Sequence, residues 1–535
     1  MSIGDWFLAS SARENSATML DRRRGDGLAW SSGNDVRPLV HGDTYFPELL
    51  RSVGMMRAGD LLMFTDWRGD PGELLDGPGS AISDVLSDAA ARGVIVKGLI
   101  WRSHLDRFAF SQEQNRHLGE QIEAAGGECL LDMRVRVGGS HHQKFVVLRH
   151  PRRAELDVAF VGGIDLCHGR NDSGDHRGDP QPQPFASVYG PTPAWHDVQL
   201  AVRGPAVGDV ETVFRERWED PQPLTRNPIN RLSELVRRDD SSAGRLPTRL
   251  PDPSPCGTAM VQILRTYPYL GRRRHYPFAP DGERSVARAY EHAINLAHRL
   301  IYVEDQYFWS SEIVQCFVRA LASKPDLRLV AVIPHHPDKE GRVSTPLNLV
   351  GREQALRDVY AAGGARVAVY GVENHSGTPV YVHAKVCVVD DLWASVGSNN
   401  VNRRSWTHDS ELACAVIDDE IDGREPAAID GFGDGARGFA RALRLELARE
   451  HLDRNEADNT ALIDPLDFFN ACADSATTLQ AWHDCGRRGP RPPGRLRPYA
   501  LAPMSRTTRA WATPLYRAAA DPDGRPARLR RSHTF

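Results

Sequence analysis

The sequence predicts an α/β protein made of two duplicated halves. Short apolar stretches typical of buried strands alternate with longer stretches in which apolar residues recur at helical spacing. A His-x-Lys spacing occurs twice, at residues 142–144 and 383–385. An aspartate at the end of an apolar run precedes each histidine by a similar distance, 76 residues for Asp66 and 78 residues for Asp305. The repeated order and spacing of these features indicate an internal duplication.

In the first half, helices and strands are expected to alternate. The positions of apolar residues predict helices over 45–56, 81–92 and 112–125, and strands over 60–66 and 94–101. The third helix should end at Gly126, because glycine readily adopts the conformation that closes a helix. The strands are apolar along most of their length, which predicts a sheet largely covered on both faces.

The second half repeats this order of elements. Its pattern predicts helices over 282–299, 311–323 and 349–362, and strands over 300–304 and 327–333. The last of these helices ends in the sequence Ala-Ala-Gly-Gly at 361–364, which also occurs at 124–127 in the first half. Each half is therefore expected to be one α/β unit.

Composition and pattern divide the chain into five segments. They are an irregular N-terminal lead-in (1–40), the first half (41–220), a connecting segment rich in Pro, Arg, Asp and Ser (221–258), the second half (259–425) and a C-terminal extension (426–535). Within the extension, a charged amphipathic helix is expected over 436–452. The Arg/Pro-rich end of the extension, past about residue 486, is expected to wrap the surface or to be partly mobile.

The composition is that of an ordinary globular protein. With 535 residues the chain is too long for a single core, and its 41% hydrophobic and 25% charged content is unremarkable. A formal net charge of −4 gives no overall basic field, so no nucleic-acid partner is expected. The eight cysteines are scattered without a Cys-x-x-Cys pair, which favours buried thiols in a reducing compartment over disulfides or a zinc site.

We find neither a signal peptide nor a transmembrane segment in the sequence. The range 1–20 lacks a basic flank followed by an apolar core of secretory length, and no run approaches 18 uninterrupted apolar residues. These features lead us to expect a cytoplasmic protein whose contact with lipid, if it has any, is peripheral.

The residues suited to chemistry lie on the apolar run 381–390. If this run is one strand, its alternation places His383 and Lys385 on the same face. An imidazole beside a fixed cation suits reaction at a phosphate ester, because one group attacks or carries a proton while the other binds the oxygens. His142 and Lys144 repeat the pair in the first half.

Each His-x-Lys run is followed by a second strand that ends in a glycine turn, over 158–165 and 394–400. Small residues there allow backbone N–H groups to approach a bound anion. No carboxylate or thiol completes a metal-ligand spacing with the loop histidines His168, His335 and His336. We therefore predict no metal ion.

Together these features resemble the phospholipase D superfamily, whose signature is a duplicated His-x-Lys-(x)4-Asp followed by Gly-Gly or Gly-Ser and a polar residue. The second copy matches at every position, namely His383, Lys385, Asp390, Gly397, Ser398 and Asn400. The first copy matches at His142, Lys144, Gly162, Gly163 and Asp165. The resemblance covers residues 40 to 425, approximately.

One position of the first copy departs from the signature. Arg149 stands where the family has aspartate, and the hairpin around it is six residues longer than in the second copy. The family's aspartate is regarded as supportive, since its side chain alternates away from the histidine and lysine. Asp157 is a candidate for replacing the missing charge.

The resemblance implies a single-chain pseudo-dimer with one shared central active site and no cofactor. One histidine would attack phosphorus, and the other would protonate the leaving alcohol and then activate water or an acceptor alcohol. We assign His142 as the nucleophile and His383 as the acid/base. The remaining implied site residues are Lys144, Lys385 and Asp390, with phosphate-binding or supporting roles for Ser398, Asn400, Asp165 and Gly163.

A carboxylate behind each imidazole is also implied, because it fixes the tautomer and raises the basicity of the ring. The positions that match the family are Glu411, expected behind His142, and Asp197, expected behind His383. Each carboxylate belongs to the half opposite its histidine, so the site should be bipartite.

The function that the resemblance implies is that of a bacterial-type phospholipase D. Such an enzyme cleaves a glycerophospholipid at a membrane surface to phosphatidate and a free alcohol, with water or an alcohol as acceptor, and a monomer suffices because the pseudo-dimer is internal. One alternative is a nuclease or a cardiolipin-synthase-like phosphatidyltransferase. Another is a non-catalytic lipid-binding module, which Arg149 suggests.

Overall fold

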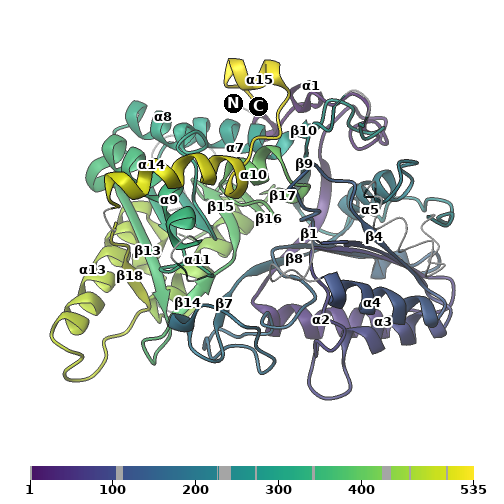
Figure 1. Cartoon of the computed structure of the whole chain (residues 1–535), viewed down its shortest axis with the longest axis horizontal. Helices are drawn as coiled ribbons and strands as arrows, with labels where there is room; N and C mark the ends of the chain where they lie inside the picture. Colours follow the sequence, from purple (N-terminus) through teal and green to yellow (C-terminus); the bar gives the residue numbers. More distant parts are fainter. Residues whose placement is uncertain are drawn as a thin grey trace.

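The computed structural model describes residues 3–103, 112–225, 227, 243–271, 274–339, 341, 344–424, 435–456, 459–501 and 504–535. Two β-sheets, each with helices packed against it, lie side by side in the molecule (Figure 1). The first half of the chain forms the purple and blue unit on the right of this view, and the second half forms the teal and green unit on the left.

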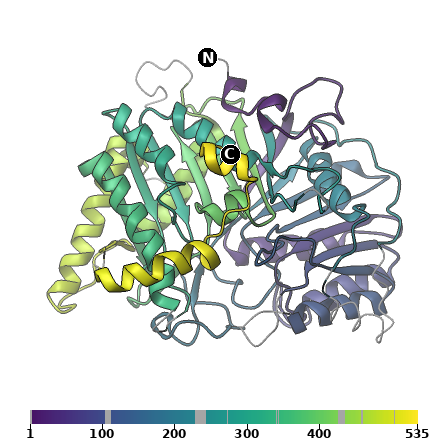
Figure 2. The same ribbon diagram turned by 45° about the horizontal axis from the view of Figure 1, so that its top comes forward.

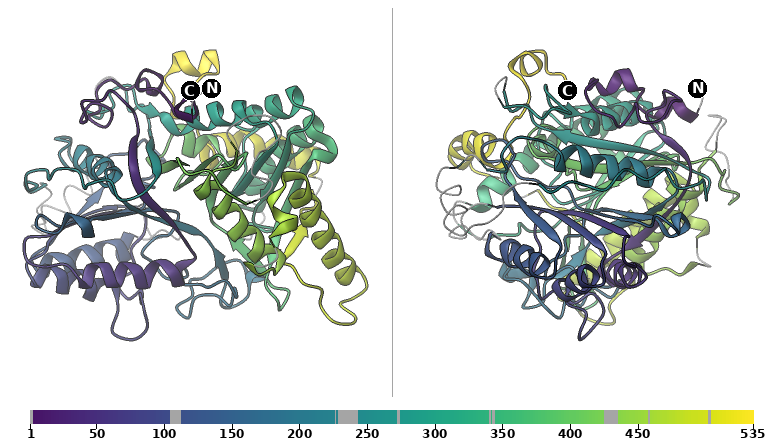
Figure 3. Two further views of the ribbon diagram at one scale, coloured as in Figure 1. Left: turned by 180° about the vertical axis from the view of Figure 1, so that it is seen from behind. Right: turned by 90° about the vertical axis from the view of Figure 1, so that its right-hand side faces the viewer.

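The first sheet has seven main strands. Their spatial order is β4 (Glu128–Asp132), β3 (Ile95–Trp101), β2 (Leu61–Asp66), β5 (Phe145–Arg149), β6 (Val158–Gly162), β8 (Val198–Arg203) and β1 (Ser31–Val40). The strands β2, β3 and β4 run parallel, and each later neighbour is antiparallel. The helices α2 (Gly42–Gly54), α3 (Ile82–Ala91) and α4 (Gln112–Ala124) lie on its outer face, as the left view of Figure 3 shows.

The second sheet repeats this topology strand for strand. Its order is β13 (Val367–Glu373), β12 (Arg328–Val332), β11 (Leu300–Asp305), β15 (Lys385–Val389), β16 (Trp393–Gly397), β17 (Glu411–Asp418) and β9 (Ala259–Tyr267), with the same parallel and antiparallel pairings. Its outer helices are α7 (Ser285–Leu296), α8 (Gln315–Ser323) and α9 (Ser344–Gly363). The predicted α/β fold with two duplicated halves is therefore correct.

The helices and strands are close to those predicted, except at some starts. The strand and helix bounds of the first half agree to within about three residues. In the second half, α8 begins at Gln315 rather than at residue 311, and α9 begins at Ser344 rather than at 349. Helix α9 begins with Ser344-Thr-Pro346, which is itself a helix-start signal, but its apolar residues lie on several sides, so periodicity alone does not locate the start.

A continuous apolar core joins the two halves. The inner faces of both sheets meet in one buried cluster that includes Val147 and Val161 from the first sheet and Val386 and Val396 from the second. Helices α5 (Ala206–Trp218) and α11 (Gly438–Leu452) also contribute to it. The outer faces bury two further clusters under their own helices. Burial on both sides explains why the strands are apolar along their length.

The N-terminal lead-in predicted over 1–40 is wrong at its end, because residues 31–40 form strand β1. This strand pairs with β8 through Asp35–Val40 and with β9 through Ser31 and Asn34, so it connects the two sheets. It contains Pro38 and several polar residues, which weaken the sequence signal for a strand. Pairing with two neighbouring strands, rather than local propensity, explains its conformation.

The C-terminal extension packs on the second half. Helix α13 (Pro465–Asp484) and strand β18 (Leu496–Pro498) adjoin β13, and α14 (Arg506–Leu515) crosses α9. Figure 2 shows α14 in yellow lying across the teal helices. Both ends of the described chain contact α7, where His292 bonds the Asp5 carbonyl and Arg288 bonds the Phe535 carbonyl. The segment past residue 486 thus wraps the second half, and part of the connecting segment (228–242) lies outside the described residues.

No helix in the described part of the chain is both long enough and apolar enough to cross a lipid bilayer.

Candidate active site

The two His-x-Lys segments lie where their hairpins begin. His142 and Lys144 directly precede β5, and His383 lies between β14 (Pro379–Val382) and β15. The run 381–390, expected as a single strand, is therefore two strands. The chain changes partners here, because β14 pairs in parallel with β7 (Ala194–His196) of the first half whereas β15 pairs with β11 and β16.

Backbone hydrogen bonds hold this change of direction. The amides of His383 and Ala384 both donate to the carbonyl oxygen of His196, at 2.7 and 3.1 Å. In the other half, the amide of His142 donates to the carbonyl oxygen of Ser410 at 2.9 Å. Each His-x-Lys segment is thus anchored to backbone of the opposite half.

Each histidine ring also contacts a carboxylate of the opposite half. Nδ1 of His142 lies 2.9 Å from Oε2 of Glu411, the first residue of β17. Nδ1 of His383 lies 2.6 Å from Oδ2 of Asp197, which links β7 to β8. A carboxylate at Nδ1 holds a proton there and leaves Nε2 for reaction. The structure brings together the two pairs named from the sequence, and the site requires both halves.

The two carboxylates have their own supporting contacts. Ser398 Oγ donates to the same Glu411 oxygen at 2.5 Å, and Trp195 Nε1 donates to Asp197 Oδ2 at 3.4 Å. The ring of Trp195 packs on His383 with centroids 4.8 Å apart, and the Arg170 guanidinium lies 3.8 Å from the centroid of the Trp195 ring. These contacts fix the orientation of the two carboxylates and of the His383 ring.

The two lysines are buried near the histidines. Lys144 Nζ donates to the His142 carbonyl at 3.1 Å and lies 3.3 Å from Asp165 Oδ1. Lys385 Nζ donates to the His383 carbonyl and, at 3.3 Å, to Gln306 Oε1. Burial lowers the pKa of Lys385 to about 8, with Asp197 opposing the shift and Lys144 adding to it. Two buried cations at one site suit an anionic ligand.

Asp165 balances part of this charge. Burial opposes its ionisation, but the neighbouring Lys144 cation lowers the pKa of Asp165 to about 2. The adjacent Asp66 carboxyl behaves oppositely, since burial and then the negative charge of Asp165 raise its pKa. Burial, Lys385 and Arg170 lower the pKa of His383, while Asp165 raises it. Charges from both halves therefore act on His383.

The turn positions Gly163 and Ser398 are equivalent in the two halves but differ in chemistry. The Ser398 hydroxyl holds Glu411, whereas a Cβ atom at Gly163 would lie 2.1 Å from Oδ1 of Asp197. Glycine at 163 therefore makes room for the carboxylate that holds His383.

A pocket of about 420 Å3 opens beside His142. Its lining includes Asn400, whose buried Oδ1 has no hydrogen-bond partner among the described residues. Aromatic side chains form much of the remaining wall, namely Trp67, Trp101, Tyr307 and Trp309. The pocket thus combines a reactive imidazole and an available polar group with an aromatic surface that suits an organic ligand.

The assignment of Asp390 to the catalytic set is wrong. Its carboxylate accepts hydrogen bonds from the backbone amides of His298, Arg299 and Leu300, at 2.7, 2.8 and 2.8 Å. Asp390 ends β15, at the opposite end of the strand from His383, and its φ of 52° turns the chain. This carboxylate fixes the entrance to β11 and does not reach the reacting groups.

In the first half, two buried carboxylates accommodate Arg149 at the position where the family has aspartate. Its Nε lies 3.2 Å from Asp157 Oδ2 and 3.3 Å from Glu211 Oε2. Asp157 therefore lies beside the altered position, but it pairs with Arg149 and accepts the amide of His150 at 2.6 Å. The substitution is compensated locally, and Arg149 is buried at the end of β5 away from the pocket.

Two strand-ending aspartates and two further side chains complete the site. Asp66 accepts the amide of Leu166, and Asp305 accepts that of Val401, both at 2.8 Å, so each holds the loop after its glycine turn. Their similar spacing before the histidines, 76 and 78 residues, indicates the role in retrospect. Gln306 and Arg170 have only weak sequence signals, since each is a single polar residue in a loop.

The fold and site define a class of protein with two homologous halves that share one composite, two-histidine site. A model described as "Phospholipase D" matches residues 77–238, and one described as "Cardiolipin synthase, PLD-like domain" matches 290–424. The chain belongs to the phospholipase D superfamily.

Individual relatives are distant. Phospholipase D alpha 1 of Cynara cardunculus is 26% identical over 78% of this chain and 64% of its own length, and phospholipase D1 of Schizosaccharomyces pombe is 27% identical over 69% and 32%. A crystal structure of phosphatidylserine synthase from Haemophilus influenzae is 12% identical, with a TM-score of 0.47, covering 72% of this chain and 82% of that one. The chain spans between about one third and just under two thirds of these two curated relatives.

Proposed function

We propose that this protein is a phospholipase D-type phosphodiesterase that converts glycerophospholipids to phosphatidate and a free alcohol. One observation carries the proposal: each histidine of the duplicated motif is held at Nδ1 by a carboxylate of the other half, beside two buried lysines. This arrangement provides two imidazoles with reactive Nε2 atoms and a cationic site for one phosphodiester.

In the first step, Nε2 of His142 attacks phosphorus and the bond from phosphorus to the alcohol oxygen breaks. His383 donates its Nε2 proton to that oxygen, so the alcohol leaves neutral. A phosphatidyl group then remains bonded to His142. Lys144 and Lys385 bind the phosphoryl oxygens while negative charge accumulates on them.

In the second step, neutral His383 removes a proton from water. The water oxygen attacks phosphorus, the bond to His142 breaks, and phosphatidate is released. Both histidines return to their starting protonation states. In this mechanism the two imidazoles supply the nucleophile, the acid and the base, so neither step requires a metal ion.

The lipid substrate is supported by the pocket and the relatives. The aromatic side chains next to His142 offer faces that bind alkyl groups or a cationic headgroup. The relatives described above are phospholipases D by name. We propose that the protein acts as a monomer at the surface of a membrane, with no nucleic-acid partner.

A second candidate activity is transfer of the phosphatidyl group to an alcohol instead of water. The match of residues 290–424 to the cardiolipin synthase model favours it. The chemistry differs only in the second step, where an alcohol oxygen replaces the water oxygen. The two activities can be distinguished by the products that one protein preparation forms.

The test uses vesicles of phosphatidylcholine and measures choline, phosphatidate and, with glycerol added, phosphatidylglycerol. We expect choline release that is lost in His142→Asn and His383→Asn variants with unchanged circular dichroism. Brief exposure to lipid labelled in the phosphate, followed by denaturation, should leave label on wild type and none on His142→Asn. A folded wild type that binds vesicles without turnover would support the binding module instead, and cleavage of DNA alone would support a nuclease.

A further inference from the structure

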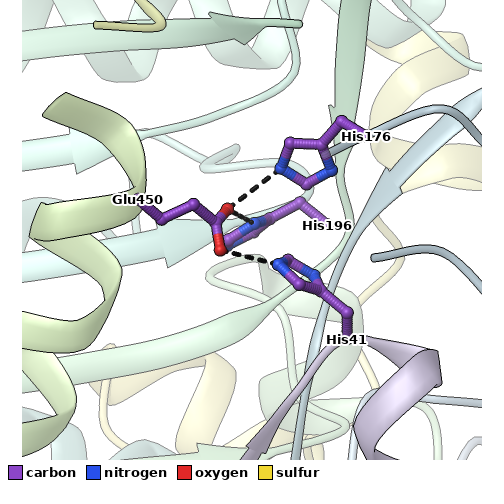
Figure 4. Close-up of side chains that lie close together, drawn as sticks. All are labelled: His41, His176, His196 and Glu450. Atoms are coloured by element: carbon purple, nitrogen blue, oxygen red, sulfur yellow. Dashed lines mark hydrogen bonds and ion pairs between the residues drawn. The ribbon is translucent and has the colours of Figure 1, made fainter. Parts of the chain in front are cut away.

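A second group of histidines converges on one carboxylate outside the proposed catalytic site. Figure 4 shows the rings of His41, His176 and His196 directed at the side chain of Glu450. His41 Nε2 lies 2.7 Å from Glu450 Oε2, while His176 Nε2 and His196 Nδ1 lie 2.9 and 3.1 Å from Oε1. All four ligand atoms lie within 4.8 Å of one another.

The four residues come from separate parts of the chain. His41 joins β1 to α2, His176 lies in the long loop after β6, His196 ends β7, and Glu450 lies near the end of α11. The three imidazoles are almost wholly buried, with 3% exposure at His41 and none at the others. The sequence gives no short ligand spacing, which is why no metal site is predicted from it.

The outer nitrogens of two rings face carboxylates. Nε2 of His196 lies 2.6 Å from Glu304, and Nδ1 of His176 lies 3.6 Å from Asp172. When a carboxylate accepts a hydrogen bond from the outer N–H of a neutral ring, the inner nitrogen carries the lone pair. In this cluster the inner nitrogen is directed at Glu450. This is the arrangement of metal-binding histidines, whose second nitrogen donates to a carboxylate.

The backbone also departs from ordinary conformations to bring these rings together. His41 has φ 70° and ψ 169°, a region that is nearly restricted to glycine, and His176 has φ 55°. Such conformations cost free energy and persist where the surroundings enforce them. A role for the imidazole side chain explains why these two positions are histidine and not glycine.

We propose that His41, His176, His196 and Glu450 form a binding site for a divalent transition-metal ion, with zinc the best match. Three imidazoles and one carboxylate are ligands that zinc accepts, and four protein ligands fill a tetrahedral shell. Tetrahedral bonds of about 2.0–2.1 Å separate ligand atoms by about 3.3 Å. The three contacts to Glu450 would therefore open by a few tenths of an ångström, while the wider separations within the group, up to 4.8 Å, would close around the ion. Four protein ligands make the site structural rather than catalytic.

A neighbouring group that shares His196 is the weaker ligand set. It contains Glu304 and His451, but Glu304 already accepts hydrogen bonds from His196, from His451 at 2.7 Å and from Tyr302. Its oxygens are therefore occupied. Glu304 instead acts on the proposed metal site by orienting His196.

The position of the site indicates what the ion does. His196 is adjacent to Asp197, and its carbonyl oxygen accepts both amides at the start of the second His-x-Lys segment. An ion held by His196 and Glu450 would fasten β7 of the first half to α11 of the C-terminal extension. It would stabilise the strand that carries the carboxylate for His383, without contact with substrate.

The test is metal binding by the full-length protein. After treatment with a chelator and dialysis against zinc, wild type should retain about one zinc per chain, as for a closed four-ligand site. His176→Ala and Glu450→Gln should lose this zinc, whereas His335→Ala, which removes a half-buried histidine outside the cluster, should keep it. Zinc should also raise the Tm of wild type and of His335→Ala but not of Glu450→Gln.

A second measurement needs no variant. Wild type loaded with Co2+ should show the intense visible absorption of a tetrahedral ion with nitrogen and oxygen ligands. Wild type that retains no zinc, or retains the same amount as Glu450→Gln, overturns the proposal, as does a weak octahedral cobalt spectrum. The four residues would then be a hydrogen-bonded cluster in which protons take the place of the ion.

Discussion

Nδ1 of His142 lies 2.9 Å from Oε2 of Glu411, although the two residues belong to different halves of the chain. The reciprocal contact joins His383 to Asp197 at 2.6 Å. Neither half therefore contains a complete pair of imidazole and carboxylate. Duplication alone would give two similar sites, but this exchange of carboxylates makes one site from two incomplete ones.

Replacing Glu411 with glutamine tests this relationship. The neutral amide cannot stabilise a positive charge on His142, and its NH2 group favours the wrong ring tautomer. We expect kcat in the choline-release assay to fall by about 10²–10⁴-fold, the usual range for a lost acid/base component, with little change in KM. Glu353→Gln, a buried carboxylate paired with Arg509, serves as the matched control. Equal losses in the two variants would indicate a general effect on folding.

A serine at position 163 would copy the second half into the first. Its Cβ would lie 2.1 Å from Oδ1 of Asp197, so the carboxylate would have to move away from His383. We expect Gly163→Ser to lower kcat by on the order of 10²-fold, because the imidazole loses its orienting partner. The measurement is steady-state choline release together with Tm.

The opposite exchange, Ser398→Gly, is the control for that experiment. It removes the hydrogen bond that Ser398 Oγ donates to Glu411 and the one that it accepts from the Leu412 amide, and it creates no clash. Because Glu411 keeps its contact with His142, we expect kcat to fall by about tenfold, which corresponds to about 1.4 kcal/mol and is smaller than the effect of Gly163→Ser. If Ser398→Gly were the more damaging change, the steric argument at position 163 would be wrong.

The sequence contains enough to predict the duplicated fold and the residue types at the site. Periodicity locates buried strands such as β2 and β11, and the spacing from Asp66 and Asp305 relates the halves. It does not predict β1, whose conformation depends on pairing with β8 and β9, nor the break at His383, which depends on β7. Contacts between distant segments decide these features, and a local pattern carries no information about them.

The same limit applies to the convergence of side chains. The carboxylates Glu411 and Asp197 are found from the sequence only through resemblance to a family. The cluster around Glu450 has no such guide, because its members are 20 to 254 residues from their nearest partners along the chain. Asp390 is conspicuous in the motif, yet its carboxylate binds backbone amides at the far end of β15.

Restoring the family's aspartate at position 149 should be harmful. The buried Arg149 lies between Asp157 and Glu211, so Arg149→Asp would remove the cation between them and add a third carboxylate, while Arg215 stays paired with Glu211. Breaking a buried ion pair in this way costs about 3–5 kcal/mol. We expect a loss of that size in the free energy of unfolding, measured with urea.

Arg152→Asp makes the same change of charge at an exposed position of the same hairpin. It should alter the free energy of unfolding by less than about 0.5 kcal/mol, as surface substitutions usually do. A stable Arg149→Asp protein with higher activity than wild type would show instead that the arginine impairs the first half.

The activity should depend on pH through Lys385. Burial lowers the pKa of this lysine from its ordinary 10.5 to about 8. The ammonium that binds the phosphoryl oxygens is present below this pH and is lost above it. We expect kcat/KM, which reports the free enzyme, to lose a further factor of up to ten per pH unit above about pH 8, in addition to the loss that deprotonation of His383, the acid of the first step, causes at lower pH.

Loss of the fold does not account for such a decline, because the stability effect of Lys385 has the opposite sign. Its folded-state pKa is lowered, so between about pH 8 and 10.5 the unfolded chain binds more protons than the folded one, and unfolding becomes less favourable as pH rises. Lys385→Arg keeps its charge throughout this range and should have lower activity without the further decline near pH 8. An identical decline in wild type and Lys385→Arg would assign the titration to another group, and a flat wild-type profile from pH 7 to 9.5 would refute the role of a lysine cation in binding the phosphate.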